Sequence, residues 1–260
     1  MFARLLILLY AIVTYAVFLV SFLYALGFVG NYLVSKSIDV GGPTNLSGNI
    51  VVDLLLLGIF AIQHSVMARP AFKRWSAKFF PEASQRSTYV LLSSLIQLLL
   101  FWQWRPIPIQ IWHVEGMVAW LLIGVYWLGW LIMLASTFMI DHFDLSGLRQ
   151  AFSALRGTEL PGQSFRTPLL YKVVRHPIML GLLLAFWATS RMTAGHVLFA
   201  AMTTAYVLVA IRLEERDLVQ FHGREYEAYR AQTGMLLPWP LPGKRRDDID
   251  VRRTGGKDKG

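Results

Sequence analysis

The side chains best suited to chemistry gather in three short polar clusters, each beside a long apolar stretch. The first cluster is Arg175-His176-Pro177, followed by Gly181. Proline suits the first position of a helix because its missing N–H would have no partner there. The basic pair would then lie at a helix N-terminus, whose free N–H groups can bind a carboxylate. Gly181 would let a ligand or another helix approach the backbone, although a basic flank of a membrane helix explains the same residues.

The second cluster is Glu214-Glu215-Arg216-Asp217, which follows an apolar stretch ending at Ile211. Carboxylates are unfavourable beside the C-terminus of a helix, so their presence needs another reason if the helix ends there. They could bind a ribose hydroxyl or face a cationic sulfonium. A solvated face of a continuing helix would account for them equally well.

The third cluster consists of histidines at the ends of apolar stretches. His64 closes one stretch, and Asp141-His142-Phe143-Asp144 follows another. Polar side chains at this depth are costly unless they face a cavity. Either histidine could accept a proton from a weakly acidic substrate, with Asp141 or Asp144 orienting its ring. A capping or interfacial role is the plainer explanation of each.

Several common sites are excluded by what the sequence lacks. There is no Gly-x-Gly-x-x-Gly turn after a strand, no Walker loop and no His-Glu-x-x-His motif. The absence of cysteine excludes disulfides, thiolate metal sites and a cysteine nucleophile. We therefore expect no metal site, and any cofactor must lie among helix ends and loops.

The composition predicts an all-α, polytopic transmembrane protein. Hydrophobic residues make up 55% of the chain and the mean hydropathy is +0.46. Five apolar stretches are long enough, or nearly so, to cross a bilayer, which needs about 20 residues. They are residues 5–34, 50–63, 88–104, 116–140 and 192–211. The first is too long for a secretory signal and is expected to be retained.

The C-terminal part is expected to contain a helical hairpin. The short apolar segment 177–190 could pair with 192–211 through a turn at 191–195, whether or not it crosses the bilayer. Residues 213–237 have helical spacing of apolar and charged side chains, which predicts an amphipathic, folded-over cytoplasmic helix. We divide the chain into a transmembrane bundle and substrate side (1–140), a cofactor-binding region (141–242) and a charged, disordered tail (243–260).

The net charge of +9 is explained by topology better than by nucleic acid. Most of the basic residues that lie between apolar stretches fall in two of the polar segments. These are Arg69, Lys73, Arg74, Lys78 and Arg86, and then Arg149, Arg156, Arg166, Lys172 and Arg175. This alternation is the positive-inside pattern and predicts that both termini are cytoplasmic. Trp102, Trp104 and Trp112 are expected to be interfacial anchors, and the basic tail could be attracted to anionic membrane lipid.

An ordered set of motifs runs through the C-terminal part of the chain. The set is Arg175-His176-Pro177-x-x-x-Gly181, Glu214-Glu215-x-x-Leu218, Gly223-x-x-Tyr226-x-x-Tyr229 and Pro238. It resembles the signature of isoprenylcysteine carboxyl methyltransferases and related membrane methyltransferases, in which this region encloses S-adenosylmethionine. The resemblance implies cofactor-binding roles for His176, Pro177, Gly181, Glu214, Glu215, Tyr226 and Tyr229. Met179, His222 and Thr233-Gly234 depart from the usual residues, which argues against a prenylated-protein substrate.

The N-terminal half carries further motifs, namely Gln63-His64-Ser65, Arg86-Ser87-Thr88-Tyr89 and Asp141-His142-Phe143-Asp144. With them, nearly the whole chain outside its tail resembles the NnrU-like membrane proteins, a group that includes bacterial methanethiol S-methyltransferases. The resemblance implies an enzyme of the bacterial inner membrane that methylates methanethiol to dimethyl sulfide with S-adenosylmethionine, leaving S-adenosylhomocysteine.

Such a reaction needs a thiolate, and even the cysteine thiol has a reference pKa of about 8.5. His64 or His142 could take the proton, with Asp144 or Asp141 orienting one of them, and Arg175 is a candidate electrostatic partner. The sequence leaves this choice open. It also leaves open another small thiol or a lipid as the substrate, a membrane reductase using NADPH, and a non-enzymatic assembly factor or transporter component.

Overall fold

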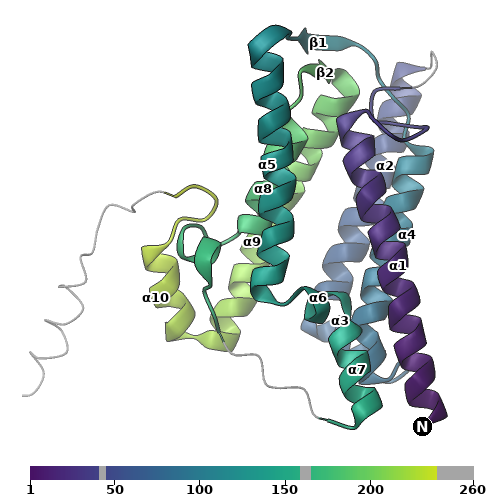
Figure 1. Cartoon of the computed structure of the whole chain (residues 1–260), viewed down its shortest axis with the longest axis vertical. Coiled ribbons are helices and arrows are strands. Elements are labelled where there is room, and N and C mark those ends of the chain that lie inside the picture. Colours follow the sequence, from purple (N-terminus) through teal and green to yellow (C-terminus); the bar gives the residue numbers. More distant parts are fainter. Residues whose placement is uncertain (41–44, 159–164, 239–260) are drawn as a thin grey trace, which may run out of the picture.

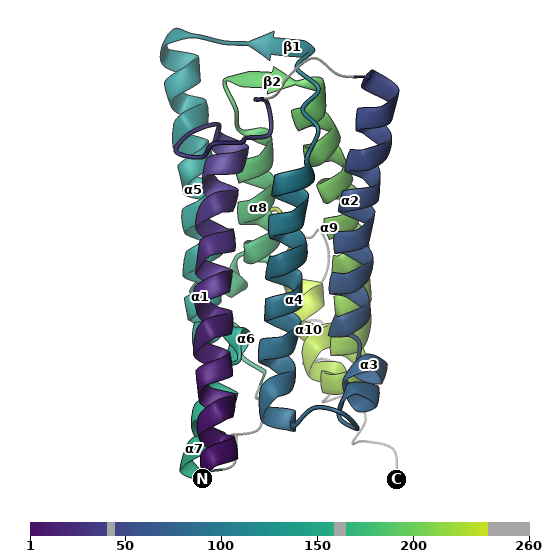
Figure 2. The same ribbon diagram turned by 90° about the vertical axis from the view of Figure 1, so that its right-hand side faces the viewer.

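The protein is an all-α membrane bundle with a small sheet at one end (Figures 1 and 2). The structure, a computed structural model, describes residues 1–40, 45–158 and 165–238. The long helices are α1 (Phe2–Gly30), α2 (Leu46–Ala68), α4 (Glu82–Gln103), α5 (Gly116–Ile140) and α9 (Ala194–His222). Of these, α1, α2, α5 and α9 are long and apolar enough to span a membrane. The polytopic helical class is therefore confirmed.

Helix α4 runs beside the apolar helices but differs from them in composition (Figure 2). It begins with the charged residues Glu82 and Arg86, and its serines Ser87, Ser93 and Ser94 are buried. It packs between α1 and α2. Buried polar residues on α4 thus face other helices, where a hydroxyl can find a partner that lipid cannot supply.

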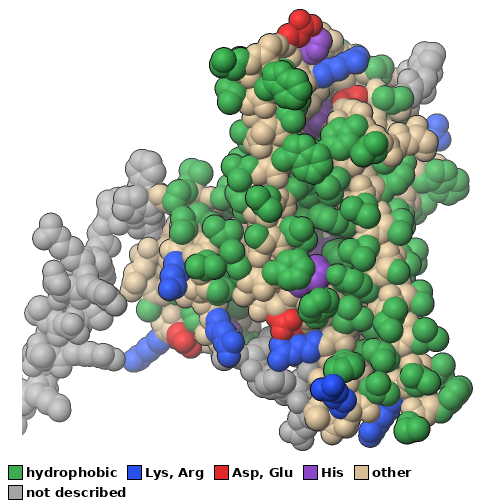
Figure 3. Space-filling view, in the orientation of Figure 1, with side chains coloured by type: hydrophobic (Ala, Val, Ile, Leu, Met, Phe, Trp, Pro, Cys, Tyr) green, Lys and Arg blue, Asp and Glu red, His purple; other side chains and the backbone are tan. Residues whose placement is uncertain are grey.

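The side of the bundle seen in Figure 3 is largely apolar between its two ends. Large exposed side chains on α1 include Leu9, Val13 and Leu23, and those on α5 include Trp120 and Leu131. Apolar surface of this extent is unfavourable in water and favourable against lipid tails. The protein is accordingly a multi-pass membrane protein.

Helix α8 (Pro177–Trp187) forms a hairpin with α9, as predicted. It has 11 residues, or about 16 Å at 1.5 Å per residue, roughly half of the ~30 Å hydrocarbon core. It is therefore too short to cross the bilayer. Its main neighbour is α5, and the two backbones approach closely at Gly129 and Gly181.

The hairpin turn forms a strand, which the prediction of an all-α protein did not include. Strand β1 (Gln110–His113) pairs antiparallel with β2 (Arg191–Thr193), and Gln110 is the partner of Thr193. These two loops exchange backbone hydrogen bonds because they emerge side by side at one end of the bundle (Figure 2). The sheet joins the α4–α5 connection to the α8–α9 turn.

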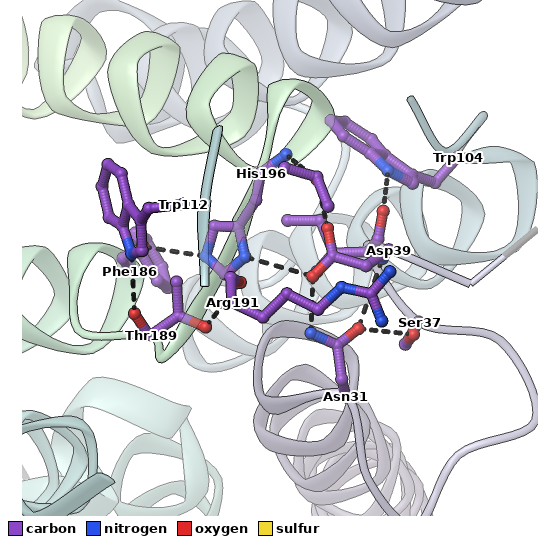
Figure 4. Close-up of polar contacts among 11 residues, drawn as sticks. Asn31, Ser37, Asp39, Trp104, Trp112, Phe186, Thr189, Arg191 and His196 are labelled. Atoms are coloured by element: carbon purple, nitrogen blue, oxygen red, sulfur yellow. Dashed lines mark hydrogen bonds and ion pairs between the residues drawn. The ribbon is translucent and has the colours of Figure 1, made fainter. Parts of the chain in front are cut away.

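A buried polar network lies beneath this sheet (Figure 4). The Asp39 carboxylate accepts hydrogen bonds from Asn31 Nδ2 at 2.6 Å and from Thr193 Oγ1. Its Oδ2 also lies 3.6 Å from His196 Nδ1. Burial raises the pKa of Asp39, but the bonds from His196, Thr193 and Asn31 outweigh it and hold that pKa below its usual value.

Trp104 belongs to the core beside this network and is not an interfacial anchor as predicted. Its side chain is fully buried, and Nε1 donates to Ile38 O at 3.0 Å. Its ring meets Phe28 and Phe199 edge-on. The interior offers this indole both a carbonyl acceptor and aromatic neighbours, whereas Trp102 and Trp112 do keep exposed surface.

The opposite end of the molecule carries the N-terminus and both basic segments (Figures 1 and 2). The small helices there are α3 (Pro70–Ser76), α6 (His142–Ser146), α7 (Leu148–Arg156), the 3₁₀ turn η1 (Leu169–Lys172) and α10 (Arg224–Gln232). Helix α9 continues to His222, as its charged continuation predicted, and Gly223, with φ +54°, then turns the chain into α10. The predicted disordered tail lies outside the described residues.

Candidate functional site

At the basic end of the bundle, the segment before α8 meets the last turns of α9. Arg175 Nε donates to Glu215 Oε1 at 2.7 Å, and His176 Nε2 lies 3.1 Å from the same oxygen. His176 Nδ1 lies 3.6 Å from Glu214 Oε2. We call Arg175, His176, Glu214 and Glu215 the inner charged cluster. Two of the predicted polar clusters therefore form one site.

The backbone after α10 pairs with the same segment. Arg175 N donates to Gly234 O at 2.8 Å and His176 N donates to Met235 O at 3.2 Å. The Arg175 guanidinium also donates to the carbonyl oxygens of Arg230 and Thr233. The C-terminal segment is thus fastened over the inner charged cluster, and Gly234 supplies a backbone acceptor there.

The two glutamates have different surroundings. The side chains of Arg175 and Glu215 are only 9% and 12% exposed, so their ion pair lies inside the protein. The Glu214 side chain is 51% exposed. Glu214 is also close enough to Arg69, Tyr89 and Tyr171 for their charges to interact. Glu215 therefore holds the basic pair in place, while Glu214 keeps open surface beside it.

Tyrosines with unused hydroxyls surround these carboxylates. The hydroxyl oxygens of Tyr171 and Tyr226 are buried and have no hydrogen-bond partner among the described residues. Burial raises the pKa of both phenols, and it raises that of Tyr229 to about 12. They are therefore neutral donors at physiological pH. A buried hydroxyl without a partner is unfavourable, so these two groups are suited to a bound polar ligand.

Tyr229 fastens the cluster in another way. Its hydroxyl donates to the carbonyl oxygen of Tyr171, which joins α10 to η1. The ring of Phe165 lies 5.8 Å from that of Tyr226 and 5.4 Å from that of Tyr229, with a steep angle in both cases. His222, a departure from the related signature, contacts Phe165 with its ring centre 5.2 Å away. These aromatic rings form one wall of the site.

Pro177 and Gly181 have distinct positions on α8. Pro177 occupies the first turn of the helix, as its chemistry predicted. At Gly181, an added Cβ would lie 2.5 Å from Gly129 O and 2.6 Å from Met133 N. Gly181 thus faces α5, and packing of two helices accounts for this glycine. The geometry does not support the cofactor contact implied for Gly181.

His64 belongs to a second polar group, in the C-terminal half of α2. Its Nε2 lies 2.7 Å from Tyr89 Oη, and its Nδ1 lies 3.3 Å from Ser93 Oγ. Gln63 Nε2 donates to Ser93 Oγ at 3.2 Å. The ring stacks on Phe60, with centres 5.3 Å apart. We call Gln63, His64, Tyr89 and Ser93 the His64 cluster.

Contacts between α2 and α9 link the two clusters. Ser65 Oγ lies 3.3 Å from Tyr206 Oη, and Arg69 Nη1 forms an ion pair with Asp217 Oδ2 at 2.9 Å. Tyr89 is close enough to Glu214 for their charges to interact, whereas the charge in range of His64 is that of Arg86. These contacts bring the two clusters to the same end of the bundle, and Tyr89 is the member of the His64 cluster that interacts electrostatically with Glu214.

His142 lies elsewhere, among α1 and α5. Its Nε2 is 2.9 Å from Tyr15 Oη, its Nδ1 is 2.9 Å from Thr137 Oγ1, and its ring stacks on Phe138 at 4.3 Å. Burial lowers the pKa of His142, although Asp141 opposes this shift. Both nitrogens thus have hydroxyl partners that would be satisfied by a neutral structural histidine.

The predicted orienting carboxylates are used within their own loop. Asp141 caps α6 by accepting from Asp144 N at 3.0 Å, and it pairs with Arg149. Asp144 Oδ1 accepts from Gln150 Nε2 at 3.2 Å. Hydroxyl groups, and not these two carboxylates, contact the ring nitrogens of His64 and His142.

The sequence did not point to Tyr171 or Tyr206. It also did not predict that Tyr89 would contact His64. Tyr89 was noted only as part of Arg86-Ser87-Thr88-Tyr89 at the start of a span. The available signal was a tyrosine and two serines within apolar sequence, where polar groups are costly. That pattern did not say which helix each hydroxyl would meet.

The fold and these contacts together define a polytopic membrane protein with a partly buried charged cluster at its basic end. A family model described as NnrU protein matches residues 54–236. The chain is 72% identical over 256 residues to methanethiol S-methyltransferase 2 of Bradyrhizobium diazoefficiens, covering 98% of this chain and 99% of that one. It is 52% identical over 240 residues to methanethiol S-methyltransferase of Mycobacterium tuberculosis, covering 91% and 98%. No solved structure matches. The chain belongs to the NnrU family.

Proposed function

We propose that this protein is an integral membrane methyltransferase that converts methanethiol to dimethyl sulfide, with S-adenosylmethionine as the methyl donor. The thiol substrate and the reaction are supported by the similarity to the methanethiol S-methyltransferases of Bradyrhizobium diazoefficiens and Mycobacterium tuberculosis. The observation that carries the site is the contact of Arg175 and His176 with Glu214 and Glu215, across the start of α8 and the end of α9. S-adenosylhomocysteine is the second product.

The residues around the inner charged cluster fit the donor chemically. It carries a carboxylate, a ribose, an adenine and a cationic sulfonium. The first turn of α8, which starts at Pro177, has free N–H groups that suit a carboxylate. Glu214 suits a ribose hydroxyl or the sulfonium, and the unpartnered hydroxyls of Tyr171 and Tyr226 suit further polar atoms. When bound, the donor supplies an electrophilic methyl group.

Arg175 and Glu215 have supporting roles in this proposal. Because their ion pair is buried and Arg175 also binds two carbonyl groups, they hold the α8 entrance, the end of α9 and the C-terminal segment together. Tyr229 completes that frame by binding the Tyr171 carbonyl. His176, hydrogen-bonded to Glu215, is placed to contact the donor. Pre-organising several elements around one ligand reduces the ordering needed on binding.

We propose His64 rather than His142 as the base that receives the thiol proton. Tyr89 of the His64 cluster interacts electrostatically with Glu214, whereas His142 is bound between α1 and α5. A base must be within hydrogen-bond reach of the proton that it accepts, directly or through one intervening group. Asp144 has no orienting role in this proposal because it binds Gln150.

We also propose that the basic end faces the cytoplasm of a bacterial inner membrane, that α4 is the fifth span and that both termini are cytoplasmic. The two basic segments lie at the end where the donor site lies, and S-adenosylmethionine is a cytoplasmic metabolite (Figures 1 and 2). A small apolar thiol can partition into lipid and reach the His64 cluster from the bilayer side. A closed, water-free pocket would favour binding of so small a substrate.

The test uses the purified full-length protein in proteoliposomes with isotope-labelled S-adenosylmethionine and methanethiol. We expect labelled dimethyl sulfide in the headspace by gas chromatography, and labelled donor retained on the protein without the thiol. Binding of NADPH in place of S-adenosylmethionine would favour a reductase. Methylation of a lipid or of hydrogen sulfide, without dimethyl sulfide from methanethiol, would replace the proposed substrate.

A further inference from the structure

The Tyr89 hydroxyl lies across the edge of the His64 imidazole. Its oxygen is 2.7 Å from Nε2 and 3.1 Å from Nδ1, while Ser93 Oγ is 3.3 Å from Nδ1. A neutral imidazole accepts at one nitrogen and donates at the other. The arrangement that satisfies every group has Tyr89 donating to Nε2 and Nδ1–H donating to Ser93. The Nε2 lone pair, through which His64 would act as a base, therefore already accepts a hydrogen bond from Tyr89.

Tyr89 is the member of this pair that interacts electrostatically with the inner charged cluster. Tyr89 is close enough to Glu214 for their charges to interact, and Glu214 contacts His176. After donating its proton to His64, the phenol oxygen still has lone pairs for a second hydrogen bond. Because the Nε2 lone pair of His64 is already used by Tyr89, a thiol beside this pair would hydrogen-bond to the Tyr89 oxygen.

Arg86 is placed to support negative charge on that oxygen. Its Cζ lies 5.5 Å from the centre of the Tyr89 ring, and its Nε donates to Leu145 O at 2.9 Å, which fixes the guanidinium. A cation near a phenol favours the anionic form that develops as its proton leaves. Phe60 and Ser93 hold the imidazole on its other sides. The geometry is that of a pre-oriented proton relay.

We propose that Tyr89 relays the thiol proton to His64. The S–H bond of methanethiol breaks as the thiol proton binds the Tyr89 oxygen. At the same time the original Tyr89 O–H bond breaks, and the phenol proton binds His64 Nε2. The thiolate sulfur then forms a bond to the methyl carbon, whose bond to the sulfonium sulfur breaks, with the electron pair staying on that sulfur. The imidazolium finally releases one proton to water. This inference rests on the function proposed above.

The test compares two nucleophiles of similar shape in single-turnover reactions of the full-length protein loaded with S-adenosylmethionine. Methanethiol needs a base, whereas methaneselenol is ionised at neutral pH and does not. We expect Tyr89→Phe to reduce the rate with methanethiol about 10²- to 10⁴-fold and to change the rate with methaneselenol only slightly. His64→Gln should give the same pattern.

The pH profile gives a second readout. With Tyr89→Phe, the thiolate must come from solution, so the methanethiol rate should rise about tenfold per pH unit below the thiol pKa. The wild-type rate should rise less steeply. Tyr10→Phe is the matched control, because Tyr10 donates to Thr88 Oγ1 at 3.1 Å on the other side of α4. It should leave both rates unchanged.

Equal losses on both nucleophiles, or a methanethiol rate of Tyr89→Phe within about threefold of wild type, would overturn the relay. A variant that still gains thermal stability from S-adenosylmethionine is folded, so those outcomes are interpretable. If the wild-type protein methylates neither nucleophile, the proposed function itself fails, and the relay fails with it. If the wild-type protein is active but the variants do not lose activity selectively with methanethiol, only the relay is excluded and the proposed function stands.

Discussion

Arg175 Nε and Glu215 Oε1 form a hydrogen-bonded ion pair at 2.7 Å between residues 40 positions apart. Both side chains are largely withdrawn from water, and His176 contacts the same oxygen. Removal of one partner of a buried pair leaves an uncompensated charge, whereas both partners together are roughly balanced. This pair therefore explains how the start of α8 and the end of α9 stay in register around a ligand.

Glu215→Gln should lower the free energy of unfolding by about 3 kcal/mol, because the Arg175 charge is left buried without its partner. It should also weaken the stabilisation by S-adenosylmethionine. Thermal unfolding in detergent, with and without the donor, measures both effects. Asp217→Asn is the control, since its ion pair with Arg69 is about one-third exposed and should contribute less than about 1 kcal/mol. Equal losses for the two variants would contradict a special role for Glu215.

Tyr226→Phe should leave the ligand-free protein as stable as wild type or slightly more stable. The hydroxyl is buried and has no partner in the described part of the chain, so its removal loses no hydrogen bond there. If this hydroxyl binds the donor, the variant should bind S-adenosylmethionine roughly 2- to 10-fold more weakly, which corresponds to one hydrogen bond. Calorimetric titration measures the affinity. Unchanged affinity would remove Tyr226 from the donor site.

Gly181→Ala should destabilise the bundle, because the new methyl group would meet backbone atoms of α5 at about 2.5 Å. Rigid helices have to move apart, and overpacking of this kind typically lowers stability by about 1–3 kcal/mol. Gly124→Ala is the matched control on α5, where an added Cβ meets nothing within 4 Å. The control should match or exceed wild-type stability through better helix propensity. A Gly181→Ala protein with unchanged stability but no donor binding would restore the cofactor role.

Asp39 should make the end of the bundle that carries the sheet sensitive to acid. Its pKa is lower in the folded protein than its ordinary value, so it contributes stability above the unfolded pKa of about 3.9. That contribution is lost as the pH falls through the lower folded value. The melting temperature of wild type should therefore fall as the pH drops below about 4. In Asp39→Asn the melting temperature should depend less on pH in this acid range.

The same variant tests the network at neutral pH. Asp39→Asn weakens the contacts with His196 and Thr193 and should lower stability at pH 7 by about 1–3 kcal/mol. Glu115→Gln provides the control, because Glu115 is exposed and lies 3.9 Å from His113. A Glu115→Gln protein should keep the wild-type pH dependence in this acid range. The Asp39 explanation fails if both variants show the same curve.

The sequence alone determined the membrane class and much of the helical layout. Long apolar stretches must become helices in lipid, because backbone polar groups have no other partners there. The alternation of basic segments placed both at one end, and the expected contact between the motifs at Arg175 and Glu214 is confirmed. The chemistry of Pro177 correctly marked the start of α8.

Tertiary structure decided which side chains meet. Helices that are apolar on all sides give little sign of which face packs, so their rotation follows from shape and from scarce polar partners. That is why Gly181 was implied as a cofactor residue although it faces α5, and why Trp104 was expected at the interface although it is in the core. The pairing of His64 with Tyr89 likewise depends on how α2 and α4 are rotated against each other. Periodicity along one segment cannot specify a contact between two.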